Sequence, residues 1–164
     1  MKLIMKVKLL PTTEQKVSLI KTIETFNKAC NYISQIAYKE KSYGEIKLYY
    51  LCYKIVRDTF GLPAQFTVRA ISKVNESYRS DRKGPHVFEK HSAIIYDQKL
   101  VSFRNLTTSY MLTVDGRINV PIVFDSYAEL RQRRAVGRAD LVYQDGDFFL
   151  YPVIELPITS FPPR

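Results

Sequence analysis

The sequence has few of the residues from which disulfide frameworks and small metal centres are built. Its 164 residues include only two cysteines, Cys30 and Cys52, and two histidines. Two cysteines cannot supply a disulfide framework or a zinc cage, which favours a reducing compartment. No apolar run approaches the roughly 18 residues of a membrane span, and residues 1–10 lack the apolar centre of a signal peptide. We therefore expect a soluble, cytoplasmic protein without a membrane segment.

Motifs for enzymatic chemistry are also missing. The chain has neither the phosphate-binding Gly-x-x-x-x-Gly-Lys loop nor a glycine-rich dinucleotide turn. His86 and His91 bracket Glu89 without the spacing of a zinc site, and both cysteines lie on apolar faces of expected helices, where thiols pack as small hydrophobes. Turn propensity explains four aspartates of the second half: Asp97, Asp115, Asp145 and Asp147. We expect no catalytic residue, metal or cofactor in this chain alone.

The positive charge of the chain is concentrated in its first part. With 46% apolar and 25% charged residues the composition is that of a folded protein, and the net charge is +9. Residues 1–90 contain 17 of the 25 lysines and arginines and 8 of the 16 acidic residues, so the remainder is neutral. Clustered cations bind polyanions by releasing counterions from phosphates, and this asymmetry favours a nucleic-acid partner over a merely solvated surface.

Hydrophobic periodicity predicts one strand, three helices and then several strands. Residues 5–9 alternate cationic and apolar side chains, as in a half-buried strand, and Thr12 with Gln15 forms a capping-box pattern at the start of a helix. We expect helices over 12–40, 45–60 and 63–79. The first has an expected apolar stripe of Val17, Ile20, Ile23, Phe26, Cys30, Ile33 and Ala37. The apolar residues expected on the second are Leu48, Leu51, Cys52, Ile55 and Val56, and those on the third are Ala70, Ile71, Val74 and Tyr78. Strands are expected over 94–96, 100–103, 109–114, 117–123, 141–143 and 148–156, with a short helix over 126–136.

This order of elements predicts an α+β protein. Asp115-Gly116 and Asp145-Gly146 each stand between apolar alternations, which is a strong signal for a β-hairpin. A lone strand at the start is marginal by itself, so the economical arrangement pairs it with the later strands. The three helices then form an insertion, after the first strand, in one small barrel or curved sheet.

Aromatic and polar side chains of the helical half are candidates for nucleic-acid contact. Tyr43, beside Gly44 at the break between two helices, belongs to no apolar stripe and could stack on a base. Gln65, Arg69 and Lys73 follow each other at intervals of four residues and so lie on one helix face. Glutamine and arginine can bind base edges or phosphates, although such a stripe is also what a solvent-facing helix shows.

Several short segments, in a fixed order along the chain, resemble one known family. They are residues 8–15 and 26–34, the pair Tyr43-Gly44, residues 64–74 with Tyr78, and later residues 95–97, 115–121 and 141–146. Together they resemble the amino-terminal region of TnpB proteins, the OrfB-type, transposon-encoded RNA-guided DNA endonucleases related to compact type V CRISPR effectors. The likeness covers nearly the whole chain.

The resemblance implies a specific architecture and a set of site residues. In the family an oligonucleotide-binding-type barrel, the wedge domain, is interrupted after its first strand by a helical recognition domain. The corresponding bounds are 1–11 and 86–158 for the barrel, 12–85 for the helices and 159–164 for a linker. The two parts hold guide RNA and target DNA and read a motif flanking the target. The match places six residues near that flanking DNA: Tyr43, Gln65, Arg69, Arg104, Thr107 and Thr108.

The chain departs from the family where it ends. The family's RuvC-like nuclease domain lies carboxy-terminal to the wedge, and the sequence stops at residues 162–164, where that domain would begin. The resemblance therefore implies a module that binds nucleic acid without cutting it. Two alternatives stay open: a metal-dependent nuclease in its own right, or a module that docks an acidic protein or a separate nuclease domain. The nuclease would use Asp97, Asp115 or Asp147 with His91.

Overall fold

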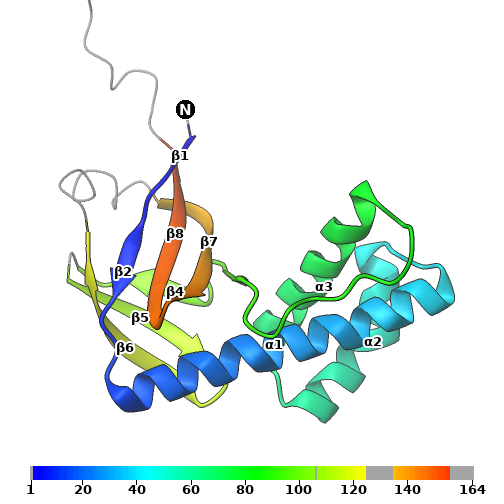
Figure 1. Cartoon of the computed structure of the whole chain (residues 1–164), viewed down its shortest axis with the longest axis horizontal. Helices are drawn as coiled ribbons and strands as arrows, with labels where there is room; N and C mark the ends of the chain where they lie inside the picture. The colour runs from blue at the N-terminus through cyan, green and yellow to red at the C-terminus, as the bar shows by residue number, and fades with distance from the viewer. Residues whose placement is uncertain (1, 106, 125–134, 156–164) are drawn as a thin grey trace, which may run out of the picture.

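A barrel of antiparallel strands and a group of three helices make up the chain (Figure 1). The structure, a computed structural model, describes residues 2–105, 107–124 and 135–155. The long first helix begins beneath the barrel and extends away from it, and the two other helices pack on its far part (Figure 1). Among the described residues, none of the helices combines the length and the hydrophobicity that a membrane span needs.

The barrel is built from strands that precede the three helices in the sequence and from strands that follow them. Seven strands follow each other in the order β3-β7-β8-β2-β6-β5-β4, every neighbouring pair is antiparallel, and β1 adds to β8. The strands are β1 (Lys2–Ile4), β2 (Val7–Leu9), β3 (Ile94–Tyr96), β4 (Val101–Phe103), β5 (Thr108–Thr113), β6 (Gly116–Val123), β7 (Ala135–Gln144) and β8 (Asp147–Glu155).

The short strand β2 joins the two later groups of strands. Val7 is paired with Leu150 of β8, and Leu9 with Ile122 of β6. The alternation of residues 5–9 has the predicted sense, since Met5, Val7 and Leu9 are buried and the lysines between them are exposed. The expected pairing of the first strand with the later ones is thus confirmed.

The strands at the two ends of this order, β3 and β4, are not joined to each other by a continuous ladder of backbone hydrogen bonds. The Tyr96 hydroxyl of β3 donates to the Leu112 carbonyl of β5 over 2.7 Å, and the Leu112 N–H donates to the Leu100 carbonyl over 2.9 Å. The barrel is therefore nearly closed.

Both predicted Asp-Gly hairpins are present. Asp145 and Gly146 have φ values of 53° and 84°, and Gly116 has φ 110°, the left-handed backbone that tight hairpins require. They connect β7 with β8 and β5 with β6. These turns fix the register that buries alternate residues of β5.

The three helices agree closely with the sequence prediction: α1 (Thr13–Glu40), α2 (Glu45–Phe60) and α3 (Ala64–Ser80). The capping box is formed, because the Gln15 N–H donates to Thr12 Oγ1 over 3.2 Å and the Thr12 N–H to Gln15 Oε1 over 3.0 Å. Gly61 ends α2 at φ 64°, a conformation that glycine adopts without strain. Phe26, Cys30, Val56, Ala70 and Tyr78 are among the residues that fill the core between the helices.

Three details of the prediction are wrong. Val17 is 62% exposed and Ile55 45% exposed, although both were assigned to apolar stripes; Leu19 is buried in place of Val17. The expected helix over 126–136 lies mostly outside the described residues, but its last two residues belong to β7. Strand β7 extends farther than predicted because its pairing with β8 continues to Ala135, past a register shift between Ala135 and Ala139.

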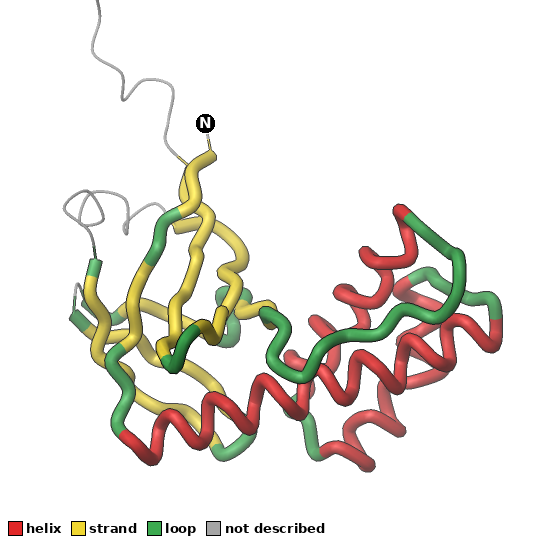
Figure 2. The backbone as a smooth tube through the Cα atoms, in the orientation of Figure 1, coloured by secondary structure: helices red, strands yellow, loops and turns green. Residues whose placement is uncertain are grey.

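The segment that returns from α3 to the barrel lies along α1 (Figure 2). The Asn31 side chain donates to the Phe88 carbonyl over 3.0 Å and accepts from the Phe88 N–H over 2.7 Å. Ser34 donates to the His86 carbonyl over 2.6 Å. Residues 86–88, expected to start the barrel, are therefore attached to the helices. The residues expected to form the linker, 159–164, lie outside the described part of the chain.

Candidate nucleic-acid interface

One face of α3 carries the predicted polar side chains, and this face is turned toward the barrel. The Gln65 amide donates to Asp97, in the turn between β3 and β4, and Arg69 Nε lies 3.3 Å from Asp97 Oδ2 as an ion pair without hydrogen-bond alignment. Glu76, farther along the same face, pairs with Arg138 of β7 at 3.1 Å. The polar stripe of α3 is therefore engaged in contacts with the barrel, and only part of it faces solvent.

Lys73 is the most constrained member of the stripe. Its ammonium donates to Asn27 Oδ1 at 3.2 Å, to Ser92 Oγ at 3.2 Å and to the Ala93 carbonyl at 2.6 Å. These acceptors match the three donors of an ammonium group. Burial lowers the pKa of Lys73. In this structure the Lys73 ammonium therefore joins α1 and α3 to the residues just before β3.

Tyr43 lies in another part of the helices. Its ring is half-buried against Tyr78, with centroids 4.8 Å apart, and the Arg82 guanidinium lies 4.8 Å from its centroid. Its carbonyl accepts a hydrogen bond of 2.7 Å from Asn75. Asn75 is ten residues beyond Gln65 on α3, about 15 Å along the helix. The structure therefore does not bring Tyr43 together with Gln65.

A second group of predicted residues lies at the end of β4 and the start of β5. Arg104 is exposed, and its Cζ atom lies 4.2 Å from the ring centroid of Tyr110. Thr107 is exposed and donates from its N–H and its hydroxyl to Asn105 Oδ1, each over 2.8 Å. Thr108 begins β5 opposite Pro121. The barrel thus places all three predicted residues of this loop close together.

Sequence reasoning missed two residues of this surface, Tyr110 and Arg117. The Arg117 Cζ atom lies 5.4 Å from the Tyr110 centroid, and its Nη2 donates to the Lys99 carbonyl over 3.0 Å. The alternation of β5 buries Ser109 and Met111 and leaves Tyr110 between them at the outer face. The Asp115-Gly116 turn then sets Arg117 opposite Leu112, two residues from Tyr110. Strand alternation with the hairpin register was the signal that could have found both. We call Arg104, Tyr110 and Arg117 the barrel-face triad.

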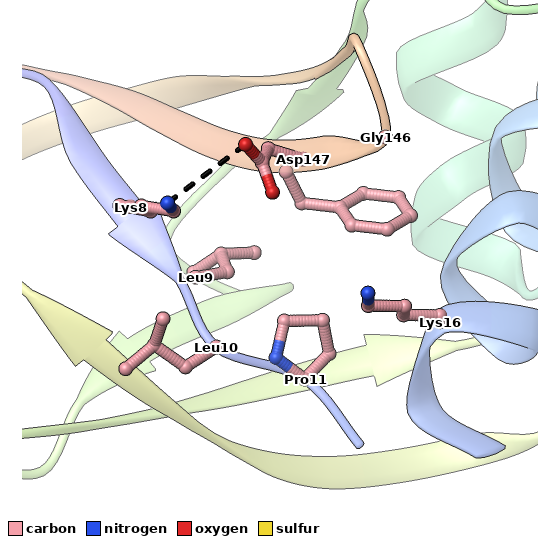
Figure 3. A pocket seen from close by; sticks show the side chains of 8 residues that line it. Lys8, Leu9, Leu10, Pro11, Lys16, Gly146 and Asp147 are labelled. Carbon is pink, nitrogen blue, oxygen red and sulfur yellow. Dashed lines mark ion pairs between the residues drawn. The ribbon is translucent and has the colours of Figure 1, made fainter. Parts of the chain in front are cut away.

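A small pocket opens where β2 passes into α1 (Figure 3). It has a volume of about 210 Å³ and lies between Pro11, Lys16 and the hairpin residues Gly146 to Phe148. Lys8 pairs with Asp147 at 3.8 Å at its edge (Figure 3). With two lysines and one aspartate the pocket has a slight excess of positive charge.

The residues of the alternative nuclease do not converge. Asp97 faces Gln65 and Arg69, and Asp147 faces Lys8. Asp115 accepts from Lys21 and Ser18, each at 3.0 Å, and these bonds lower the pKa of its carboxyl. His91 bonds Glu24 at 2.7 Å. Within the described ranges, no three histidine, cysteine or acidic side chains are grouped so that they could hold a metal ion.

Comparison with known proteins adds no assignment. No family model matches the sequence, and no curated protein matches it.

Proposed function

We propose that the chain is a nucleic-acid-binding module of the kind found in transposon-associated RNA-guided DNA endonucleases, without their nuclease domain. In this proposal the barrel and the helices hold guide RNA and target DNA. The architecture supports it, because three helices follow the first strands and precede the remaining strands of one barrel. The family resemblance of the sequence implies the same order.

The observation that carries the proposal is the barrel-face triad. Two guanidinium groups lie over one tyrosine ring on the outer face of β5 and β6, and Arg117 is held further by the Lys99 carbonyl. Arginines fixed in this way lose less side-chain entropy when they bind, and their remaining N–H groups suit the phosphate oxygens of a nucleic acid. Aromatic and guanidinium planes also stack on unpaired bases. The exposed Thr107 hydroxyl lies in the loop that follows Arg104.

The distribution of charge gives independent support. All of the net charge of +9 resides in residues 1–90, which form β1, β2, the three helices and most of the segment that returns from α3 to the barrel. Lysines of α1 and α2 stay exposed, including Lys28, Lys47 and Lys54. A polyanion that contacts the barrel-face triad would therefore meet further cations along the helices.

Binding of a fluorescently labelled, structured RNA and of duplex DNA, followed by anisotropy, tests the proposal. The variant Arg104→Gln with Arg117→Gln removes both guanidinium groups of the triad, and we expect it to weaken RNA binding at least tenfold, about 1 kcal/mol for each contact. The matched control, Arg57→Gln with Arg138→Gln, removes the same charge from α2 and β7 and should change binding much less. The unmodified protein should leave both nucleic acids intact in the presence of Mg²⁺.

Two results would overturn the proposal. One is the absence of binding to either nucleic acid by the folded protein. The other is equal weakening by the two double variants, since the triad would then contribute only its charge.

A further inference from the structure

We propose that the outer face of β2 and β8 binds a single strand of nucleic acid, with an unpaired base stacked on Phe149 and a neighbouring phosphate in the pocket beside Lys8 and Lys16. This inference rests on the proposed function and adds to it a class of ligand and a second place on the barrel. Strands β2 and β6 separate β8 from β5, so Phe149 lies about 14 Å across the sheet from Tyr110 of the barrel-face triad.

Two aromatic side chains of β8 point away from the core of the barrel. Phe149 and Tyr151 are half-buried, and they alternate along the strand with Phe148, Leu150 and Pro152, which are buried. The centroids of the two outward rings are 6.5 Å apart. The strand therefore presents two neighbouring rings on one face, an arrangement on which successive bases of a nucleic acid stack.

The Phe149 ring has a face that is open to a charged group. The Lys6 ammonium lies 4.4 Å from the centroid of this ring, and Lys6 is exposed. An exposed ammonium over an aromatic ring marks a face that no side chain of the core covers. Because the stem of a lysine is flexible, a base that stacks on Phe149 displaces the Lys6 ammonium toward the phosphate of the same nucleotide.

The pocket beside these rings has the size for one phosphate group. Lys8, directly opposite Phe149 in the sheet, lies at its edge, and Lys16 reaches it from the first turn of α1 (Figure 3). Its volume of about 210 Å³ is below the roughly 300–1,000 Å³ of sites that enclose a whole small molecule. The Lys16 ammonium makes neither a hydrogen bond nor an ion pair with the part of the chain that the structure describes. A phosphate oxygen would supply its partner.

The charges of this face favour a polyanion. The carboxylates described on it, Asp140 and Asp147, already lie 3.9 and 3.8 Å from a cation. Lys6 and Lys16 pair with no carboxylate among the described residues, so the face keeps an excess of two positive charges. The phosphates of a nucleic acid complement these charges, and the two flat rings favour bases over the side chains of an acidic peptide.

The strand must be unpaired. Inside a duplex both faces of a base are covered by its neighbours, so the ring of Phe149 reaches the plane of a base only in a single-stranded segment. Stacking tolerates any base because every base has a flat face. The site therefore selects unpaired over paired nucleic acid and discriminates little between sequences.

A tryptophan reporter tests the stacking directly. The chain contains no tryptophan, so Phe149→Trp places a single fluorescent indole in the site. We expect an oligouridylate of about ten nucleotides to quench this fluorescence, and a blunt duplex of the same length to leave it unchanged. The control is Tyr50→Trp, at a ring of α2 that is 82% exposed, and neither ligand should quench it. An oligothymidylate of the same length, compared with the oligouridylate, identifies whether the site prefers a DNA or an RNA strand.

Affinities measured by fluorescence anisotropy test the two halves of the site separately. Phe149→Leu keeps an apolar side chain but removes the flat ring, and we expect it to weaken binding of the oligouridylate about tenfold, unlike the control Tyr50→Leu. Lys16→Gln removes one phosphate contact and should make the salt dependence of this binding shallower by about 0.7. Its matched control is Lys39→Gln, an exposed lysine about 35 Å farther along α1, which should leave the slope unchanged.

The outcomes separate this site from the proposed function. Equal quenching by the single strand and the duplex, or equal quenching in the two tryptophan variants, overturns the strand site. An unchanged affinity in Phe149→Leu or an unchanged salt slope in Lys16→Gln overturns it as well. The proposed function then stands if the double variant of the barrel-face triad still weakens binding of structured RNA.

Two further results are decisive. Loss of self-association in Phe149→Leu by sedimentation, without a change in oligonucleotide binding, would assign the face to a second copy of the chain and overturn the site. If the unmodified protein binds no nucleic acid, both proposals fail.

Discussion

Cys30 and Cys52 show how far a single residue can be interpreted from the sequence. Both were predicted to pack in the helical core, and both are fully buried. Burial raises the pKa of Cys30 to about 12 and that of Cys52 to about 11, so neither is a thiolate at neutral pH. The apolar stripes of α1 and α2 were sufficient to predict this.

We expect both thiols to be unreactive in the folded protein. A thiol reagent at mildly alkaline pH should modify neither cysteine on the time scale of minutes, and it should modify both at once in concentrated guanidinium chloride. Rapid modification of the native protein at either position would contradict the described packing.

Lys73 shows what the sequence could not tell. Its spacing from Arg69 predicted a common face but not what that face meets, and the three acceptors come from Asn27, Ser92 and Ala93, distant in sequence. We expect Lys73→Met to lower the free energy of unfolding by roughly 2 kcal/mol, because it leaves half-buried acceptors unpaired. Urea denaturation measures this, with Lys28→Met, an exposed lysine of α1, as the near-neutral control. Unchanged stability of Lys73→Met together with weaker RNA binding would contradict this structural role and assign Lys73 a contact with the nucleic acid.

Glu24 gives the molecule a pH-dependent link between α1 and the loop before β3. The hydrogen bond from His91, with a contribution from Lys90 and against a smaller opposing effect of burial, lowers the pKa of Glu24 below its ordinary 4.5. A lowered carboxyl pKa adds stability above the unfolded value, and this stability is lost as the pH falls through the native value. We expect Glu24→Gln to cost about 0.2–1 kcal/mol at neutral pH and nothing in strong acid. Denaturation at both pH values checks this, and an equal cost at both would exclude the link.

At the scale of elements, α3 is the helix whose environment the sequence left open. Its buried stripe of Ala70, Ile71, Val74 and Tyr78 is confirmed. Its polar stripe had two interpretations, a solvated face or a nucleic-acid face, because local periodicity cannot distinguish water from a neighbouring strand. In the structure this stripe joins the helices to the barrel through Asp97 and Arg138.

The turn between β3 and β4 depends on one of these contacts. Asp97 accepts from the Lys99 N–H over 2.9 Å and also faces Gln65 and Arg69. We expect Asp97→Ala to lower the free energy of unfolding by roughly 2–3 kcal/mol, because Arg69 then keeps a partly buried charge without its partner. Chemical denaturation measures the loss, and Gln98→Ala, the exposed next residue, is the control. Equal stabilities would mean that the helices and barrel do not depend on this contact.

At the scale of the whole molecule, the order of elements was predictable and the surface of the barrel was only partly so. Capping residues, Asp-Gly turns and clear periodicity specified the helices and hairpins, since each is a local signal. The candidate site depends on side chains of β5, β6 and the loop after β4. The family resemblance of the sequence pointed to Arg104 but to neither Tyr110 nor Arg117. Their proximity follows from strand register, which a list of residues does not show.

The central claim is that the barrel-face triad and the basic helices bind phosphate groups of a nucleic acid. The salt dependence of RNA binding tests this claim most directly. If at least three phosphates are contacted, the logarithm of the association constant should fall with the logarithm of salt concentration with a slope of about −2 or steeper. In the variant Arg104→Gln with Arg117→Gln the slope should be smaller by about 1.5, because each lost phosphate contact removes about 0.7–0.9 from it. A flat dependence in the unmodified protein, or the same slope in both proteins, would contradict the account.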